Sequence, residues 1–181
     1  DLDSVASRNH PRLFFSAAEF DALKNKVAMP ENTILAKMNS MVISMADDAL
    51  DKEEHLEYAL DVSGRRLLRI SREAIVRITS CAYAYRLTGQ KRYLDKAEEE
   101  LNAVCAFKDW NESHFLDVGE MALAVSVGYD WLYDALSSVT KTAVEKALKE
   151  NAFMPAFGRE KLPWFYRSGI NWNQVCNGGL T

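Results

Sequence analysis

The residues best suited to chemistry gather in the last stretch of the chain, from position 164 to position 181. Four aromatic side chains fall within nine positions there, and four carboxamides fall within seven: Trp164, Phe165, Tyr166 and Trp172, and Asn171, Asn173, Gln174 and Asn177. Carboxamides are mediocre helix formers because they compete for backbone hydrogen bonds. Aromatic rings beside amides suit a surface that recognises a hydroxylated ligand such as a sugar. The alternative is that the aromatics form core and the amides cap helices and turns.

The same stretch is basic within an acidic protein. Residues 156 to 181 hold three basic side chains, Arg159, Lys161 and Arg167, against the single acid Glu160, whereas the chain of 181 residues carries a net charge of −4. A local positive field of this kind is consistent with an anionic ligand. The overall negative charge argues against a general nucleic-acid surface, and the sequence contains no nucleic-acid-binding motif.

His114, which precedes an expected helix and lies near Trp110 and Asp117 in the sequence, is a further candidate for ligand contact. The alternative is a capping or packing role, which is commoner for a lone histidine. Asp130 and Asp134 form an i, i+4 pair, and paired carboxylates invite comparison with glycosidases. Because close neighbours on one helix do not flank a substrate bond, we interpret both as structural.

Several other classes of site are disfavoured by the sequence. Three widely spaced cysteines, Cys81, Cys105 and Cys176, form no CxxC pair, and no cluster of metal ligands occurs, so we expect neither a metal nor a cofactor. Gly178-Gly179 lacks the spacing of a phosphate-binding loop. We expect no membrane span, because no apolar run is long enough, and the sequence shows no signal-peptide pattern.

Hydrophobic periodicity predicts helices throughout and no convincing strand. A capping box formed by Ser16 and Glu19 starts a first helix that runs to about Val27. Further helices are expected over 33–50, 65–87, 93–106, 116–136 and 138–152, and another begins at Asn171. On the 33–50 segment the apolar residues recur at helical spacing: Ile34, Leu35, Met38, Met41, Val42 and Met45. On the 65–87 segment Arg65, Arg69 and Arg72 share a stripe, which we interpret as a solvated face.

The expected helices follow one another through short connections. Met154-Pro155 is expected to end the 138–152 helix, and Gly89 to cap the 65–87 helix. Segments 65–87 and 93–106 form one antiparallel pair, and 116–136 and 138–152 form another. We therefore expect an all-α fold of antiparallel helical hairpins forming part of an (α/α) toroid, or else an α-solenoid. We expect a single helical domain over 1–181, and the abrupt stop within the last helix favours the N-terminal part of a longer protein.

Several stretches resemble a known family. The lead-in His10-Pro-Arg-Leu-Phe-Phe-Ser16 is similar to that of heparinase II/III-like polysaccharide lyases, and Tyr85-Arg-Leu-Thr-Gly-Gln-Lys-Arg-Tyr-Leu-Asp-Lys-Ala97 resembles a hairpin common in α/α-toroid carbohydrate enzymes. The more specific motifs are His114-Phe-Leu-Asp-Val-Gly-Glu120, Gly128-Tyr-Asp-Trp-Leu-Tyr-Asp134 and Asn171-Trp-Asn-Gln-Val-Cys-Asn-Gly-Gly179. Their order and spacing resemble the N-terminal toroid region of that family over most of the chain.

The resemblance implies β-elimination on 4-linked uronate-containing anionic polysaccharides, with heparin- or heparan-sulfate-like chains favoured, in a periplasmic or secreted protein. Such chemistry needs a group that neutralises the substrate carboxylate, a base and an acid. By resemblance, Asn171 is the catalytic candidate at the carboxylate. Substrate contacts are expected from Trp172, Asn173, Gln174, Trp164, Tyr166, Arg167, His114 and Trp110. Arg159 and Arg167 are suited to sulfate or carboxylate groups.

The sequence departs from the family pattern in its last stretch. No histidine or glutamate lies between Ser168 and Thr181, and the proton-transfer tyrosine and histidine of the family would lie beyond Thr181. Tyr166 is a candidate local substitute. The chain alone is therefore expected to lack a complete catalytic set and to need the remaining part of its parent chain. The alternatives are a non-catalytic carbohydrate-binding helical domain and a helical-repeat protein-interaction module.

Overall fold

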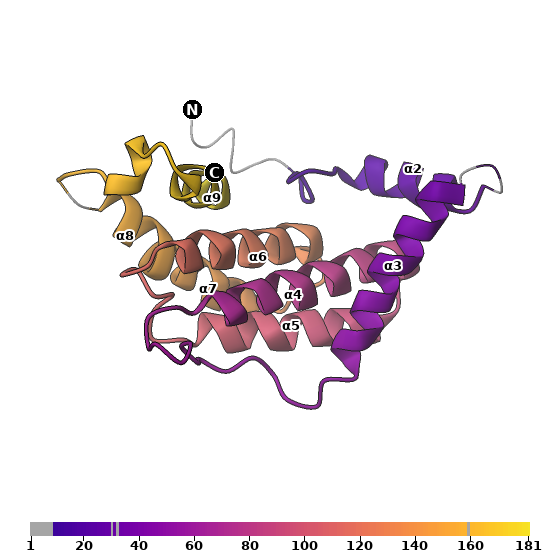
Figure 1. Ribbon diagram of the computed structural model, residues 1–181. Coiled ribbons are helices and arrows are strands. Elements are labelled where there is room, and N and C mark those ends of the chain that lie inside the picture. Colours follow the sequence, from indigo (N-terminus) through magenta and orange to yellow (C-terminus); the bar gives the residue numbers. More distant parts are fainter. Residues whose placement is uncertain (1–8, 30, 32, 159) are drawn as a thin grey trace.

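The computed structural model describes residues 9–29, 31, 33–158 and 160–181, which form helices and loops but no strand (Figure 1). The helices are α2 (Ala17–Val27), α3 (Thr33–Leu50), α4 (Leu68–Thr88), α5 (Lys91–Cys105), α6 (Leu116–Leu132), α7 (Ser138–Ala147), α8 (Met154–Phe157) and α9 (Asn171–Leu180). A π-helical turn (Leu148–Phe153) joins α7 to α8, and a 3-10 turn (Trp164–Arg167) precedes α9. The prediction of an all-α fold is confirmed for the described residues.

Helices α4 and α6 lie side by side in the centre of the molecule and run in the same direction (Figure 1). At their beginnings, the backbone N–H of Leu67 donates to the Asp117 carboxylate at 3.0 Å. Towards their ends, the Arg86 side chain donates to the carbonyl oxygen of Trp131. After Gly89, whose φ of 69° gives the predicted left-handed cap, α5 returns antiparallel to α4.

Helices α5 and α7 form an outer layer over α4 and α6. Helix α7 packs mainly against α5 and has few contacts with α6. The carboxylate of Glu98 in α5 accepts hydrogen bonds from the backbone N–H of Ser137 at 2.9 Å and from the Thr140 hydroxyl at 2.7 Å. Ser137 is also the N-cap of α7, because its hydroxyl accepts the Thr140 N–H at 3.1 Å.

Several helix limits differ from those expected, since α5 begins at Lys91 and α6 ends at Leu132, and two further differences have a clear cause. Helix α4 begins at Leu68 and not at Arg65, because the carboxylates of Asp61 and Asp117 bind the backbone N–H groups of residues 65–67 and hold them outside the helix. Arg65 therefore lies outside α4 and does not form part of the arginine stripe expected on that helix. Pro155 does not end the helical segment, since it lies in the first turn of α8, where no backbone N–H is needed.

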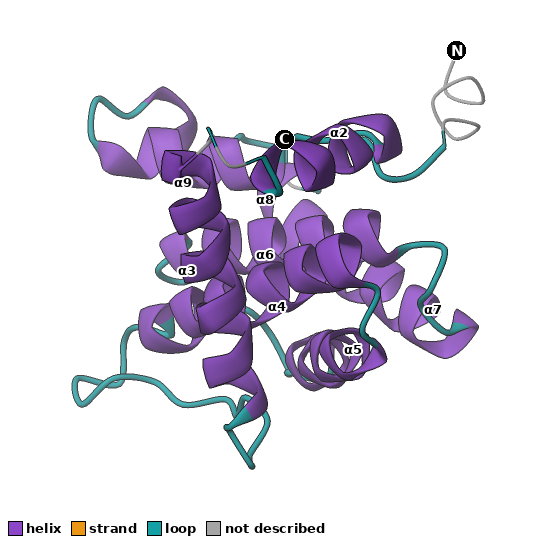
Figure 2. Ribbon diagram, turned by 90° about the vertical axis from the view of Figure 1, so that its right-hand side faces the viewer, coloured by secondary structure: helices purple, strands orange, loops and turns teal. Residues whose placement is uncertain are grey.

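Helix α3 packs on the core through small residues and the part-buried Ile43 and Leu50, and it exposes four of its long apolar side chains. Figure 2 shows α3 running upright while α5 is seen nearly end-on. The buried residues of α3 are Ala46 and Ala49, and its Asn39 accepts a hydrogen bond from Tyr83 at 3.0 Å. The exposed apolar side chains, which we call the α3 stripe, are Ile34, Met38, Met41 and Met45.

The lead-in segment is fixed to the last turn of α6. Asp130 is 2% exposed, and its carboxylate accepts the backbone N–H groups of Arg12 and Leu13, each at 2.7 Å. The His10 ring approaches the same carboxylate at 2.6 Å and stacks on Tyr133. Asp130 is therefore a structural anchor.

None of the described helices combines the length and the apolar character that crossing a membrane requires.

Candidate functional site

The start of α6 holds a buried carboxylate that organises its surroundings. Asp117 is fully buried, and it accepts hydrogen bonds from the Leu67 N–H and from the side-chain amide of Asn111. It lies in the first turn of α6, where the positive end of the helix dipole stabilises an anion. Its other oxygen faces Nδ1 of His114 at 3.3 Å. These partners offset the cost of burying a charge and fix the orientation of the His114 ring.

Asn111 is a supporting residue that the sequence analysis missed. Its backbone has a φ of 60°, a left-handed conformation that asparagine tolerates better than most residues. Its side-chain amide donates both to Asp117 and to the carbonyl oxygen of Arg65, the latter at 2.9 Å. An asparagine in a loop is the only signal for this role in the sequence, and it is too common to be specific.

Three of the predicted site residues form a row of rings that leads from the surface to the start of α6. Trp172 Nε1 donates to the carbonyl oxygen of His114 at 2.9 Å, and the two rings meet edge to face with centroids 5.4 Å apart. Trp164 follows at 5.9 Å from Trp172 and is 62% exposed. Exposed ring faces of this kind suit stacking on a sugar.

Helix α9 reaches this position because two glycines let it cross α6 at close range. A Cβ atom on Gly179 would lie 2.0 Å from the carbonyl oxygen of Gly119, and one on Gly119 would lie 2.9 Å from that of Val175. Cys176 is buried in the same contact. Burial raises the pKa of its thiol to about 12, so Cys176 is protonated near neutral pH and acts in packing rather than as a nucleophile.

The predicted carboxamides have different environments. The Asn173 amide donates to the carbonyl oxygens of Phe165 at 3.3 Å and Tyr166 at 2.7 Å, which ties the 3-10 turn to α9 and occupies both of its donor hydrogens. Asn171 and Gln174 are exposed, and their side chains make no hydrogen bond to another described residue. Asn171 and Gln174 are therefore available to a ligand, whereas Asn173 has a structural role.

Trp110 lies outside this surface. Its ring is fully buried, and Nε1 donates to the carbonyl oxygen of Val104 at 3.0 Å. The prediction that Trp110 contacts a ligand is wrong, because this loop folds its aromatic side chain into the core and satisfies the indole N–H there.

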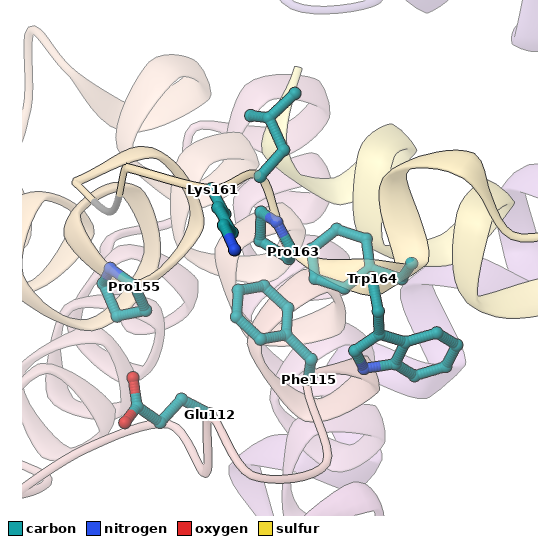
Figure 3. Close-up of a pocket in the computed structure, with 8 residues that line it drawn as sticks. Glu112, Phe115, Pro155, Lys161, Pro163 and Trp164 are labelled. Atoms are coloured by element: carbon teal, nitrogen blue, oxygen red, sulfur yellow. The ribbon is translucent and has the colours of Figure 1, made fainter.

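Two shallow hollows lie on either side of Trp164. Figure 3 shows the first, with Pro155 and Glu112 facing Phe115 and Pro163. Its volume is about 340 Å³, and that of the second is about 350 Å³. The second hollow is lined by Lys161, Leu162, Pro163, Trp164, Tyr166 and Arg167. Both volumes fall in the range of small-ligand sites.

The second hollow is lined by two cations, Lys161 and Arg167, whereas Glu112 offsets Lys161 in the first. Lys161 and Arg167 are exposed, and neither forms an ion pair with a described residue. Arg159, which we expected beside them, lies outside the described residues. Across the described ranges, no group of three or more histidine, cysteine, aspartate or glutamate side chains is placed to hold a metal ion. The surface therefore offers amides, ring faces and cations, a combination suited to an anionic sugar.

Comparison with known proteins leaves the family open. No family model matches the chain, and a search of curated proteins gave no match. The resemblance to heparinase II/III-like lyases therefore stays a prediction that depends on the motifs of the sequence.

Proposed function

We propose that the chain is part of a polysaccharide lyase that acts by β-elimination on 4-linked, uronate-containing anionic glycans, with heparin- or heparan-sulfate-like chains favoured. One observation carries the proposal: a row of aromatic rings lies at one end of the helices, and the segment around it supplies an exposed carboxamide and two exposed cations that make no ion pair or side-chain hydrogen bond with the described residues. These groups are Asn171, the row Trp164, Trp172 and His114, and the cations Lys161 and Arg167.

The reaction explains why these groups belong together. β-Elimination removes the proton on C5 of a uronate, beside a carboxylate on which negative charge grows in the transition state. A neutral amide such as that of Asn171 donates two hydrogen bonds without charge, and so stabilises the growing charge at the carboxylate. The indole faces of Trp164 and Trp172 would hold the sugar rings, and Lys161 and Arg167 would attract the polyanion.

Proton transfer requires further groups. His114 has its Nδ1 held by Asp117, and Tyr166 is exposed beside the second hollow. We propose that the remaining groups come from a longer, periplasmic or secreted parent protein in which this chain is the N-terminal part of an (α/α) toroid. The parallel pair of α4 and α6 beneath the outer layer of α5 and α7 supports this arrangement.

The second candidate is a non-catalytic carbohydrate-binding helical domain. It is favoured by the composition of the surface around Asn171, which provides ring faces and cations but only one oriented histidine. Such a domain would bind the same glycans without cleaving them.

The proposal is tested by an assay of the chain and its longer parent on a panel of uronate polysaccharides. β-Elimination creates a C4–C5 double bond, so we expect ultraviolet absorbance to rise with the parent, and glycan binding without absorbance with the chain alone. Asn171→Ala should lower turnover by about tenfold or more, equivalent to about 1.4 kcal/mol in the barrier. Asn177→Ala, in the same helix, is the matched control and should leave turnover unchanged. Binding without absorbance from the parent would favour the non-catalytic candidate.

A further inference from the structure

We propose that Arg65 and Arg66 form a second cationic contact for the anionic glycan, at the same end of the molecule as Asn171 and Trp172. This inference rests on the proposed function and extends its binding surface to the segment before α4. The chemical groups recognised would be sulfate or carboxylate, which guanidinium groups bind through paired hydrogen bonds.

The backbone of this segment is held from two sides. The Asp61 carboxylate accepts the backbone N–H groups of Arg65 at 3.0 Å and Arg66 at 3.3 Å, and the Arg66 carbonyl oxygen accepts the Asp61 N–H at 2.8 Å. On the other side, the Asn111 amide donates to the carbonyl oxygen of Arg65 at 2.9 Å. Because the backbone is fixed before any ligand arrives, binding would order only the two side chains, which lowers its entropic cost.

An unbroken series of contacts connects this segment to the aromatic row. The amide of Asn111 that binds Arg65 also binds Asp117, and Asp117 faces His114 at 3.3 Å. The His114 ring in turn lies against Trp172. Figure 1 shows the same proximity at the level of helices, since α4 and α6 begin at one end of the molecule and α9 lies over the first half of α6. Three side chains, Asn111, Asp117 and His114, therefore connect the backbone of Arg65 to the Trp172 ring.

Both arginine side chains are exposed, and Arg66 is in addition attracted to the Asp61 carboxylate. Neither Arg65 nor Arg66 forms an ion pair with any residue in the described segments. The next two arginines of the chain differ in this respect, since each pairs with a glutamate: Arg69 with Glu73 at 3.7 Å and Arg72 with Glu120 at 3.3 Å.

The acidic groups around the arginines leave the segment with a positive charge. The Ser63 hydroxyl and the Arg65 N–H lower the pKa of the Asp61 carboxyl, so Asp61 is ionised and offsets one of the two positive charges. Asp117 is buried and compensated by its own donors. Residues 61–67 therefore carry one net positive charge, and the side chains of Arg65 and Arg66 are exposed.

The test is the salt dependence of heparin binding by the intact chain and by R65Q/R66Q. Each ionic contact to a polyanion releases counterions, so its loss reduces the slope of log affinity against log salt by about 1. We expect R65Q/R66Q to bind heparin about tenfold more weakly at low salt, with a slope reduced by about 1 to 2. Glutamine keeps the backbone contacts, and circular dichroism checks the fold.

R69Q/R72Q is the matched control, because it removes the same charge from arginines that already have partners. We expect a change of less than about threefold in its affinity. Equal losses in the two double variants would indicate a general charge effect and overturn the inference. Binding that is lost in Asn171→Ala but unchanged in R65Q/R66Q would also overturn it, while leaving the proposed function in place. Failure of the unmodified chain to bind heparin or any other uronate polysaccharide would overturn both.

Discussion

At the scale of single residues, the candidate site depends on the buried carboxylate of Asp117. Its hydrogen-bond partners are neutral donors, the Leu67 N–H and the Asn111 amide, together with the ring of His114. A buried donor whose acceptor is removed loses its bond and stays desolvated. Asp117 therefore links the stability of the α4–α6 contact to the orientation of His114.

We expect Asp117→Asn to lower the free energy of unfolding by about 2 to 3 kcal/mol. Asparagine keeps one oxygen for the Leu67 N–H and the Asn111 amide, which share a single oxygen of the carboxylate, but it removes the negative charge that strengthens both bonds and turns an NH2 group toward His114. Urea unfolding followed by circular dichroism measures the change. Asp48→Asn, an exposed position on α3, is the control and should alter stability by no more than about 0.5 kcal/mol. Equal stability of the two variants would contradict the role assigned to Asp117.

The sequence was a good guide to which types of residue form the candidate site, but a poor guide to which of them are exposed. Trp164, Trp172 and His114 lie together as a candidate surface, whereas Trp110 is core. The residue type is the same in Trp110 and Trp164, but burial depends on what packs over a side chain from distant parts of the chain. The role of Asn111 was not predicted, because it depends on contacts with residues at positions 65 and 117 that the local sequence does not show.

At the scale of elements, the sequence predicted those helix ends that depend only on interactions between neighbouring residues. The capping box of Ser16 and Glu19 and the left-handed cap at Gly89 are both present, because each involves only neighbouring residues. The start of α4 was not predictable, because Asp117, which lies 50 positions further along, binds the N–H of Leu67. The crossing of α9 over α6 likewise depends on a glycine in each helix.

This crossing predicts opposite effects for two adjacent glycines. Gly179→Ala places a methyl group against the backbone of Gly119 and should destabilise the docking of α9 by about 1 to 3 kcal/mol. Gly178→Ala meets no atom within 4 Å and should stabilise the helix by about 0.5 to 1 kcal/mol. Thermal unfolding of both variants measures the difference. A shift in the same direction for both would show that the helices do not cross here.

At the scale of the whole molecule, exposed apolar side chains gather at two opposite sides of the helical array. The α3 stripe lies on one side in Figure 1, and α8 lies on the other. Residues exposed around α8 include Met154, Phe157 and Leu162. Contiguous apolar surface of this kind marks contacts with another polypeptide or a liability to associate. The outer layer of α5 and α7 exposes fewer such residues, so we expect any association to involve these two sides.

We expect the chain to self-associate as its concentration rises, because contact between these sides removes apolar surface from water. Met38→Glu with Met41→Glu should shift the sedimentation equilibrium toward the single chain, since it places two charges in the α3 stripe. Ser40→Glu with Ser44→Glu adds the same charge to exposed positions of the same helix outside the stripe, and should leave association unchanged. A single-chain mass for the unmodified protein at every concentration would contradict the prediction. Equal dissociation in both double variants would assign the effect to charge repulsion rather than to the stripe.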